Sequence, residues 1–367
     1  MIKSFDQSRG KPMKLHPKAR PIISKLALPT PIQKYFSNCE WDIDLSNNTN
    51  PYLGDLSDYP DIKQHQLKKL YLKTLFSLTP SFTARNKSLL TSDNILFTAG
   101  SMEAIDLLLR TFSEPNTDVI CVTSPTFSAY EHWSLIHNLR VKKLPLYGDN
   151  LNHLSIDKVM RINPKITFIC DPNNPTGTKL KPELIQKLCN SLEGFVVIDE
   201  AYIEFSDHSS SIFNLHHHEN LIILRTLSKA WGLAGVRCGA IIADASIINA
   251  LRYVQLPFTI SSLTQVSVEQ QLLNPERTFA SWKKIKQNRD DLIERLSEFK
   301  GVTKVFKSET NFIMVILNNL QKTMELLREN KIQVLDCSEN YPSAIRVSIG
   351  NEEQNKKFLD VIQLSSP

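Results

Sequence analysis

The sequence lacks the features that mark secreted, membrane-spanning and metal-binding proteins. Its six cysteines stand singly, with no C-x-x-C pair, and several lie in apolar runs such as residues 119–122. We therefore expect free, buried thiols in a reducing compartment. No apolar run is long enough to cross a membrane, and the basic N-terminus contains no hydrophobic signal segment. These absences predict a cytoplasmic protein.

An excess of one charge is also absent, because 43 lysines and arginines stand against 38 acidic residues. A net charge of +5 on 367 residues is mild, and no helix-turn-helix or zinc module is recognisable, so we expect neither nucleic acid nor membrane as a partner. Residues 216–218 are adjacent histidines, which cannot all face one ion on a regular element. We expect a surface loop there and no metal.

What the sequence does contain is an alternation of strand-like and helix-like segments between residues 95 and 242. Apolar runs typical of buried strands lie at residues 95–98, 119–123, 166–170, 194–199 and 221–225, and helical patterns lie at residues 102–112, 128–137 and 182–191. Such alternation predicts a mainly parallel sheet covered by helices, with ligands at the carboxyl ends of its strands.

A second, smaller unit follows in the sequence. A charged helical stretch from about residue 265 to 298 leads to strand patterns at residues 302–306, 311–316, 332–335 and 345–348, with helical patterns at 320–330 and near the C-terminus. This order predicts a smaller α+β domain.

The segment at residues 221–239 carries the candidate nucleophile. An apolar strand is followed by TLSKAWGLAGVRCG, in which Lys229 stands between the hydroxyls of Thr226 and Ser228 and ahead of Arg237. Burial and cationic neighbours lower the pKa of a lysine, and a neutral amine can attack a carbonyl. Lys229 is therefore predicted to react with a carbonyl compound.

Three further motifs follow other predicted strands. TAGSME at residues 98–103 turns into a helix, for which Ser101 is a natural N-cap, and the free N–H groups there favour an anion. DPNNPTG at residues 171–177 is a rigid turn that would hold an amide side chain still. Asp199 follows a buried strand and needs a cationic partner, such as a protonated pyridine nitrogen. No G-x-x-x-x-G-K-[ST] motif accompanies it to support a nucleotide or metal site.

Together these motifs resemble the cofactor site of fold-type-I, pyridoxal-phosphate-dependent aminotransferases, and most closely that of the histidinol-phosphate aminotransferase family. The resemblance runs from about residue 45 to 359. It implies an α/β fold in which a large domain with a mainly parallel seven-stranded sheet is joined to a smaller α+β domain. We expect residues 1–50 to be an N-terminal arm that is part of the small domain, residues 51–265 the large cofactor-binding domain, and residues 266–367 the C-terminal small domain.

The resemblance also implies how the cofactor is held. Lys229 would bind pyridoxal 5′-phosphate covalently and then act as base and acid, and Asp199 would face the ring nitrogen. The remaining cofactor ligands would be Phe127 stacked on the ring, Asn174 and Tyr202 at its phenolic oxygen, and Gly100, Ser101, Met102, Thr226, Ser228 and Arg237 at the phosphate. Met102 replaces an acidic residue of the family, so only its backbone contact carries over. Tyr59, in the motif DYPD, would reach the phosphate from a second subunit, which implies a homodimer.

The substrate side is matched less completely. AIRVSIG at residues 344–350 and LSNNTNP at residues 45–51 resemble the segments that supply substrate contacts, here Arg346 and Asn50. VLDC at residues 334–337 puts Leu335 where family members that bind histidinol phosphate usually carry an arginine, and the family's P-Y-x-P-G element is absent.

We expect histidinol phosphate as amino donor and 2-oxoglutarate as acceptor. The alternatives are another donor such as an aromatic amino acid, or a threonine-phosphate decarboxylase-like lyase, which the segment CSENYP at residues 337–342 resembles. A non-catalytic protein that senses the cofactor or binds nucleic acid is the alternative from a different class.

Overall fold

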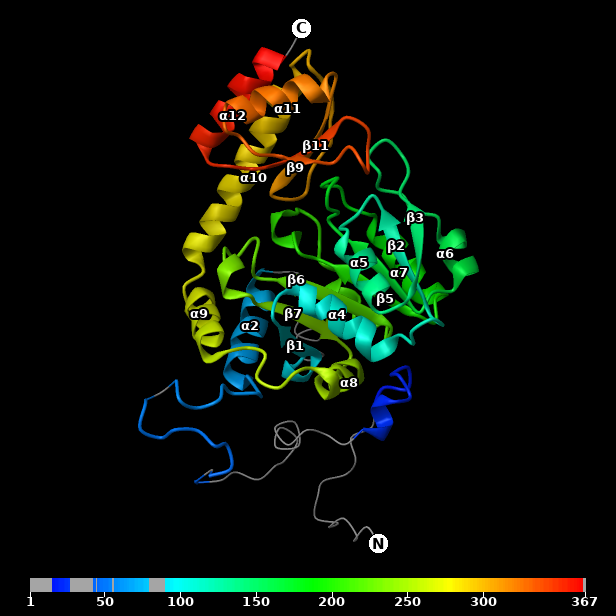
Figure 1. The fold of residues 1–367 in the computed structure, drawn as a ribbon, viewed down its shortest axis with the longest axis vertical. Helices are drawn as coiled ribbons and strands as arrows, with labels where there is room; N and C mark the ends of the chain where they lie inside the picture. The colour runs from blue at the N-terminus through cyan, green and yellow to red at the C-terminus, as the bar shows by residue number, and fades with distance from the viewer. Residues whose placement is uncertain (1–14, 27–41, 44, 55, 79–89, 366–367) are drawn as a thin grey trace.

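The computed structural model describes residues 15–26, 42–43, 45–54, 56–78 and 90–365 (Figure 1). Its larger unit is built on a seven-stranded sheet in the order β1-β7-β6-β5-β4-β2-β3. The strands are β1 (Ile95–Thr98), β2 (Val119–Ser124), β3 (Arg140–Pro145), β4 (Ile166–Cys170), β5 (Phe195–Asp199), β6 (Leu221–Thr226) and β7 (Gly239–Ala243). Only β7 runs against its neighbours, so the predicted mainly parallel sheet is confirmed.

Helices cover this sheet and bury it. They are α2 (His65–Leu78), α4 (Ser101–Phe112), α5 (Ala129–Ile136), α6 (Ile156–Ile162), α7 (Pro182–Ser191), α8 (Ala245–Val254) and α9 (Ser262–Leu273). Helix α4 packs against α5 and α8, and α6 packs against α7. Every residue of β4, β5, β6 and β7 is buried, as expected for strands of a sheet that is covered on both faces.

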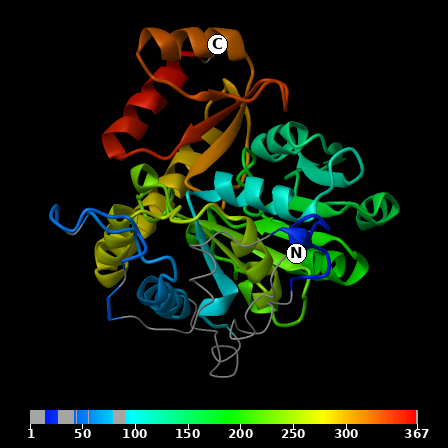
Figure 2. The same ribbon diagram turned by 60° about the horizontal axis from the view of Figure 1, so that its bottom comes forward.

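The smaller unit is a four-stranded antiparallel sheet in the order β10-β11-β9-β8, and it stands at one end of the molecule in both ribbon views (Figures 1 and 2). Its elements are α10 (Glu276–Ser297), β8 (Val302–Val305), β9 (Phe312–Leu317), α11 (Leu320–Glu329), β10 (Leu335–Asp336), β11 (Ala344–Ser348) and α12 (Glu352–Ser365). Its helices and sheet enclose a separate core that includes Leu292, Ile313 and Ile362.

The predicted single helix from residue 265 to 298 is wrong. Helix α9 ends at Leu273 and α10 begins at Glu276, with Asn274 and Pro275 between them. A proline has no backbone N–H and clashes with the preceding turn, so it interrupts a helix that the charge pattern alone would continue. The break separates α9, which packs on α2, from α10, which packs on α12 and β8.

Residues 15–26 of the N-terminal arm contact the large unit. The N–H of Arg20 donates to the carbonyl of Thr111 over 3.0 Å, and its guanidinium pairs with Glu114 at 3.2 Å. The ring of His16 packs against Phe112 and Phe195. Residues 15–26 thus lie on α4 and β5, whereas the family resemblance had grouped the arm with the small domain.

The structure bears on the predictions made for the cysteines, for the three adjacent histidines, and for membrane-spanning and metal-binding segments. Five of the six cysteines are free and buried there, as expected, and Cys39 lies outside the described ranges. His216 and His217 are exposed in the loop before β6, which confirms a surface loop. Within the described residues, no helix is long and apolar enough to cross a membrane, and no three side chains are grouped as ligands for a metal ion.

Candidate active site

The candidate site lies at the carboxyl ends of the large sheet, where β11 of the small unit approaches it. Arg346 of β11 donates from Nη1 to Oδ1 of Asn174, in the turn after β4, over 2.6 Å. The guanidinium also lies 5.0 Å from the ring centre of Phe312, and its buried Nε has no hydrogen-bond partner within the described part of the chain. The site is therefore composed of both units, and Arg346 retains a free donor.

Asp199 is the buried acid of the site. It is the last residue of β5 and 2 % exposed. Its Oδ2 accepts a hydrogen bond from the hydroxyl of Tyr130 at 2.8 Å, and its Oδ1 accepts one from the N–H of Ala201 at 3.1 Å. Burial raises the pKa of Asp199 to about 6, although both hydrogen bonds oppose the shift. A carboxylate held in this way favours a cationic partner.

Lys229 lies in the loop between β6 and β7. The base of this loop is closed by a hydrogen bond of 3.0 Å from the N–H of Leu227 to the carbonyl of Cys238. Burial of the amine, and then the charges of Arg346 and Arg237, lower the pKa of Lys229, while Asp199 opposes the shift. The surroundings of Lys229 therefore lower its pKa, as predicted from the sequence.

An anion cradle is formed where α4 begins. Gly100 has a φ of 83°, and a Cβ atom there would lie 2.6 Å from Nη2 of Arg237. A Cβ on Gly239 would lie 2.9 Å from the backbone N of Ser101. Arg237 also donates from Nη1 to Oγ of Ser228 over 3.3 Å. The two glycines thus let a guanidinium, a hydroxyl and a helix N-terminus converge, which is a suitable site for a phosphate.

One detail of this cradle differs from the prediction. The N-cap of α4 is Gly100, and Ser101 is the first helical residue. The side chain of Thr226 is engaged by the N–H of Ser228, at 3.2 Å. Met102, in the first turn, is half-buried and packs against the core of the large unit.

The turn that carries Asn174 is fixed by buried polar contacts. At its base, Asp171 pairs with Lys179 at 2.7 Å and accepts the N–H of Leu180 at the same distance. Burial raises the pKa of Asp171. Burial alone would lower the pKa of Lys179, but the carboxylate raises it above its usual value. Asn173 accepts a hydrogen bond from the hydroxyl of Thr126, so the turn is also joined to the segment that carries Phe127.

Two aromatic residues predicted for the site lie beside it. The half-buried ring of Phe127 meets the ring of Tyr130 edge to face at 5.6 Å. The buried ring of Tyr202 meets Phe312 in the same manner at 5.0 Å, and burial raises the pKa of its hydroxyl. Both rings are thus fixed by neighbouring aromatic rings.

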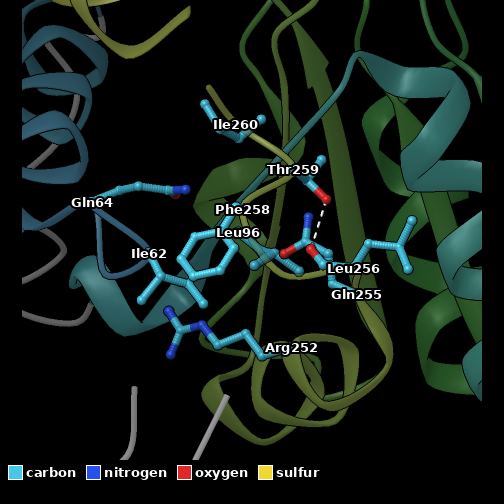
Figure 3. A pocket seen from close by; sticks show the side chains of 9 residues that line it. All are labelled: Ile62, Gln64, Leu96, Arg252, Gln255, Leu256, Phe258, Thr259 and Ile260. Atoms are coloured by element: carbon cyan, nitrogen blue, oxygen red, sulfur yellow. Dashed lines mark hydrogen bonds between the residues drawn. The ribbon is translucent and has the colours of Figure 1, made fainter. Parts of the chain in front are cut away.

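Two predicted residues are found elsewhere in the described chain. Asn50 is exposed, and its side chain accepts the N–H of Tyr52 at 3.1 Å. Tyr59 is 55 % exposed and stacks on the ring of Phe258 at 4.4 Å. Figure 3 shows the small cavity beside Phe258, which is also lined by Arg252 and encloses about 20 Å³, the space of one water molecule.

The sequence analysis missed two kinds of supporting residue. It assigned no role to Tyr130, although this residue lies only three positions after Phe127. It also missed Arg225 in β6, which pairs with Glu200 at 3.1 Å and Glu204 at 2.9 Å in the interior. These pairs connect the strand that leads to Lys229 with the segment that follows Asp199.

Comparison with known proteins gives a consistent result. The profile of the family described as aminotransferase class I and II matches residues 47–362. A histidinol-phosphate aminotransferase of Christiangramia forsetii is 34% identical over 319 residues, which cover 86% of this chain and 87% of that protein.

Solved structures share the fold. The histidinol-phosphate aminotransferase from Clostridium acetobutylicum aligns with a TM-score of 0.73 and 23% identity, over 84% of this chain and 90% of that one. The L-threonine-O-3-phosphate decarboxylase from Porphyromonas gingivalis aligns with a TM-score of 0.70 and 21% identity, over the same shares of the two chains. At these identities the likeness shows the fold of the chain and not its activity.

Proposed function

Because the chain belongs to the class I and II aminotransferase family, we propose that it transfers the amino group of histidinol phosphate to 2-oxoglutarate, with pyridoxal 5′-phosphate as cofactor, in the cytoplasm. Family membership makes the chain a transaminase that acts on small molecules. The donor, the acceptor and the role of each residue are the proposal. The observation that supports it best is the convergence of Lys229, Asp199 and the phosphate cradle at one edge of the sheet.

The residues present fit the three parts of the cofactor. The phosphate fits the cradle of Arg237, Ser228 and the first turn of α4, which only glycine at position 100 leaves open. The ring nitrogen, when protonated, would pair with Asp199, and the aldehyde carbon would bond to Lys229. When bound, pyridoxal phosphate acts as an electron sink for bonds that break at the substrate carbon.

The chain's own residues then handle protons and orientation. With its pKa lowered, the Nζ of Lys229 is neutral in a larger share of molecules, so it can take up a proton and return it. Asp199 favours a protonated ring nitrogen, because unit charges about 4 Å apart attract by roughly 4 kcal/mol at an effective dielectric constant near 20. Arg346, whose Nε has no hydrogen-bond partner among the described residues, binds the anionic group of the substrate through its guanidinium.

The homodimer is also part of the proposal. Residues 45–54 and 56–59 lie in a segment that leaves the body of the molecule in Figure 1. Several large apolar side chains of this segment are exposed. Leu45 and Tyr52 are 91 % exposed, and Leu53 is 76 % exposed. Apolar side chains gathered on one exposed segment suit a protein–protein contact. In such a dimer Tyr59 would be available to the site of the second subunit.

A donor panel tests the function. We expect glutamate to form from 2-oxoglutarate and histidinol phosphate at a higher kcat/KM than with phenylalanine or threonine phosphate. Faster turnover of phenylalanine would contradict the donor and support the aromatic alternative, in line with Leu335 standing where the family has an arginine. Release of carbon dioxide from threonine phosphate without glutamate would instead support the lyase.

A further inference from the structure

Tyr130 is a fully buried tyrosine whose hydroxyl points at the acid of the site. It lies in the first turn of α5 and is 0 % exposed, and its hydroxyl donates to Oδ2 of Asp199 at 2.8 Å. Its ring stacks on Phe168 of β4, with centres 5.1 Å apart and planes 5° apart. The ring of Phe127 meets the ring of Tyr130 edge to face, with ring centres 5.6 Å apart. The hydroxyl is therefore directed by packing on two sides of the ring.

The carboxylate of Asp199 is held by donors from two different segments. Tyr130 binds one oxygen from α5, and the N–H of Ala201 binds the other from the chain that follows β5. Each carboxylate oxygen can accept a second hydrogen bond, so this arrangement fixes the plane of the group and leaves a lone pair free. A carboxylate in an apolar interior needs such donors to remain charged.

The groups that act electrostatically on this pair come from several elements, namely Cys170 at the end of β4, Glu200 and Tyr202 after β5, and Lys229 after β6. Burial raises the pKa of Tyr130 well above its usual value, so its hydroxyl stays protonated. Burial also raises the pKa of Asp199 to about 6, and the hydrogen bond from Tyr130 is the largest influence that opposes this rise.

We propose that Tyr130 is a positioning residue, whose hydroxyl orients the Asp199 carboxylate and keeps it ionised for the ring nitrogen of the cofactor. Tyr130 does not touch the reacting atoms in this account, and it acts only through Asp199. The inference rests on the proposed function for the identity of the cofactor. The hydrogen bond itself lies within the protein and can be measured without any cofactor.

The test compares Tyr130→Phe with wild type and with Tyr71→Phe. Tyr71 is also fully buried, but its ring packs on Phe97 of β1. The titration of Asp199 is followed in the apoprotein by carboxyl ¹³C NMR, with Asp199→Asn to assign the signal. In Tyr130→Phe we expect the pKa of Asp199 to rise by about one unit or more. The dissociation constant of pyridoxal phosphate should increase about threefold or more at pH 6.5, and hardly at all at pH 8.5, where both proteins carry the carboxylate.

A role in packing alone predicts a different outcome. The dissociation constant would then rise equally at both pH values and the Asp199 titration would not move, which would overturn the proposal. 3-Fluorotyrosine at position 130 tests the same bond without deleting it, since its more acidic hydroxyl is a stronger donor and should lower the pKa of Asp199. This variant also serves if Tyr130→Phe does not fold.

Failure of this inference is distinguishable from failure of the proposed function. A wild-type protein that binds no pyridoxal phosphate would refute the function, while the titration in the apoprotein would still measure the Tyr130–Asp199 bond. An active enzyme whose Asp199 titration is the same with and without the Tyr130 hydroxyl would refute the inference alone.

Discussion

Arg346 belongs to the small sheet and Asn174 to the turn that follows β4 of the large sheet, yet Nη1 of the arginine lies 2.6 Å from Oδ1 of the asparagine. The pair joins the end of β4 to the middle of β11. In the proposed function the arginine holds the substrate and the asparagine holds the phenolic oxygen of the cofactor. This hydrogen bond would therefore set the distance between the two molecules that react.

Replacing Arg346 with Lys is expected to weaken substrate binding more than cofactor binding. A lysine keeps the charge but cannot bind an anionic group through two parallel donors. We expect the KM for the amino donor to rise about tenfold or more, as loss of a charge-assisted bond of about 1.5–3 kcal/mol implies, with the dissociation constant of pyridoxal phosphate nearly unchanged. Steady-state kinetics and a cofactor titration measure both. A KM like that of wild type would remove Arg346 from the substrate site.

Lys229→Ala should bind pyridoxal phosphate but form no covalent adduct and give no turnover. The only change is the loss of the amine that bonds to the aldehyde and moves the proton. Mass spectrometry after borohydride reduction should show the adduct in wild type and not in the variant. Lys187→Ala, at an exposed position of α7, is the control and should behave like wild type. Transamination by Lys229→Ala would refute the assignment.

Gly100→Ala should weaken cofactor binding through the phosphate. The new Cβ would lie 2.6 Å from Nη2 of Arg237 and would also require a φ of 83°, which alanine tolerates poorly. We expect the dissociation constant to rise tenfold or more and the unfolding free energy to fall by about 1–3 kcal/mol. Gly235→Ala is the matched control, because a Cβ there meets no atom of the described residues within 4 Å. Equal affinity in the two variants would place the phosphate elsewhere.

Asp171→Ala should destabilise the protein strongly, because it leaves Lys179 buried without its counter-charge. The two side chains are 0% and 5% exposed and lie 2.7 Å apart. Removing one partner of a buried pair typically costs about 3–5 kcal/mol, to be measured by urea unfolding. Glu352→Ala breaks an exposed pair with Lys284 and should change stability by less than about 1 kcal/mol. Similar losses in both variants would contradict this account of the turn.

The raised pKa of Asp199 predicts a pH-dependent contribution to the stability of the apoprotein. With a folded pKa of about 6 against an ordinary value of 3.8, the folded state binds the proton more tightly. The stabilisation from protonated Asp199 is present below about pH 4 and is lost as the pH rises through 6. The stability of Asp199→Asn relative to wild type should therefore increase by up to about 3 kcal/mol between pH 4 and 7. A constant difference across this range in denaturant titrations would show that Asp199 is not destabilised by burial.

The parts of the fold that follow a simple periodicity could be predicted from the sequence. Both β4 and α7 have the predicted bounds, because the hydrophobic periodicity of each is uninterrupted and its end is clear in the sequence. Strand β3 was not predicted, since it is an edge strand whose residues are mostly exposed and carry no apolar run. The break between α9 and α10 was missed because charge and helix pattern continue on both sides of Pro275.

The residues of the candidate site also fall into those that could be predicted from the sequence and those that could not. Lys229, Asp199, Asn174 and the cradle residues lie at or near the ends of strands, and the sheet brings such positions together. Tyr130 and Arg225 could not be singled out, because their roles depend on which side chain faces them across the interior. For Asn50 and Tyr59 the proposed roles involve a loop that extends from the body of one chain, so a single chain leaves them as predictions.

The direction of β7 has a consequence for how the reactive lysine can change. Because β7 runs against β6, the chain leaves the sheet after Thr226 and re-enters it beside that residue with Gly239. Lys229 therefore stands on a loop that is closed at its base, at the carboxyl end of β6. Lengthening or shortening this loop between its two anchors would move the amine without shifting any strand. Reactivity could thus diverge among relatives while the sheet, its hydrogen-bond register and its interior stay the same.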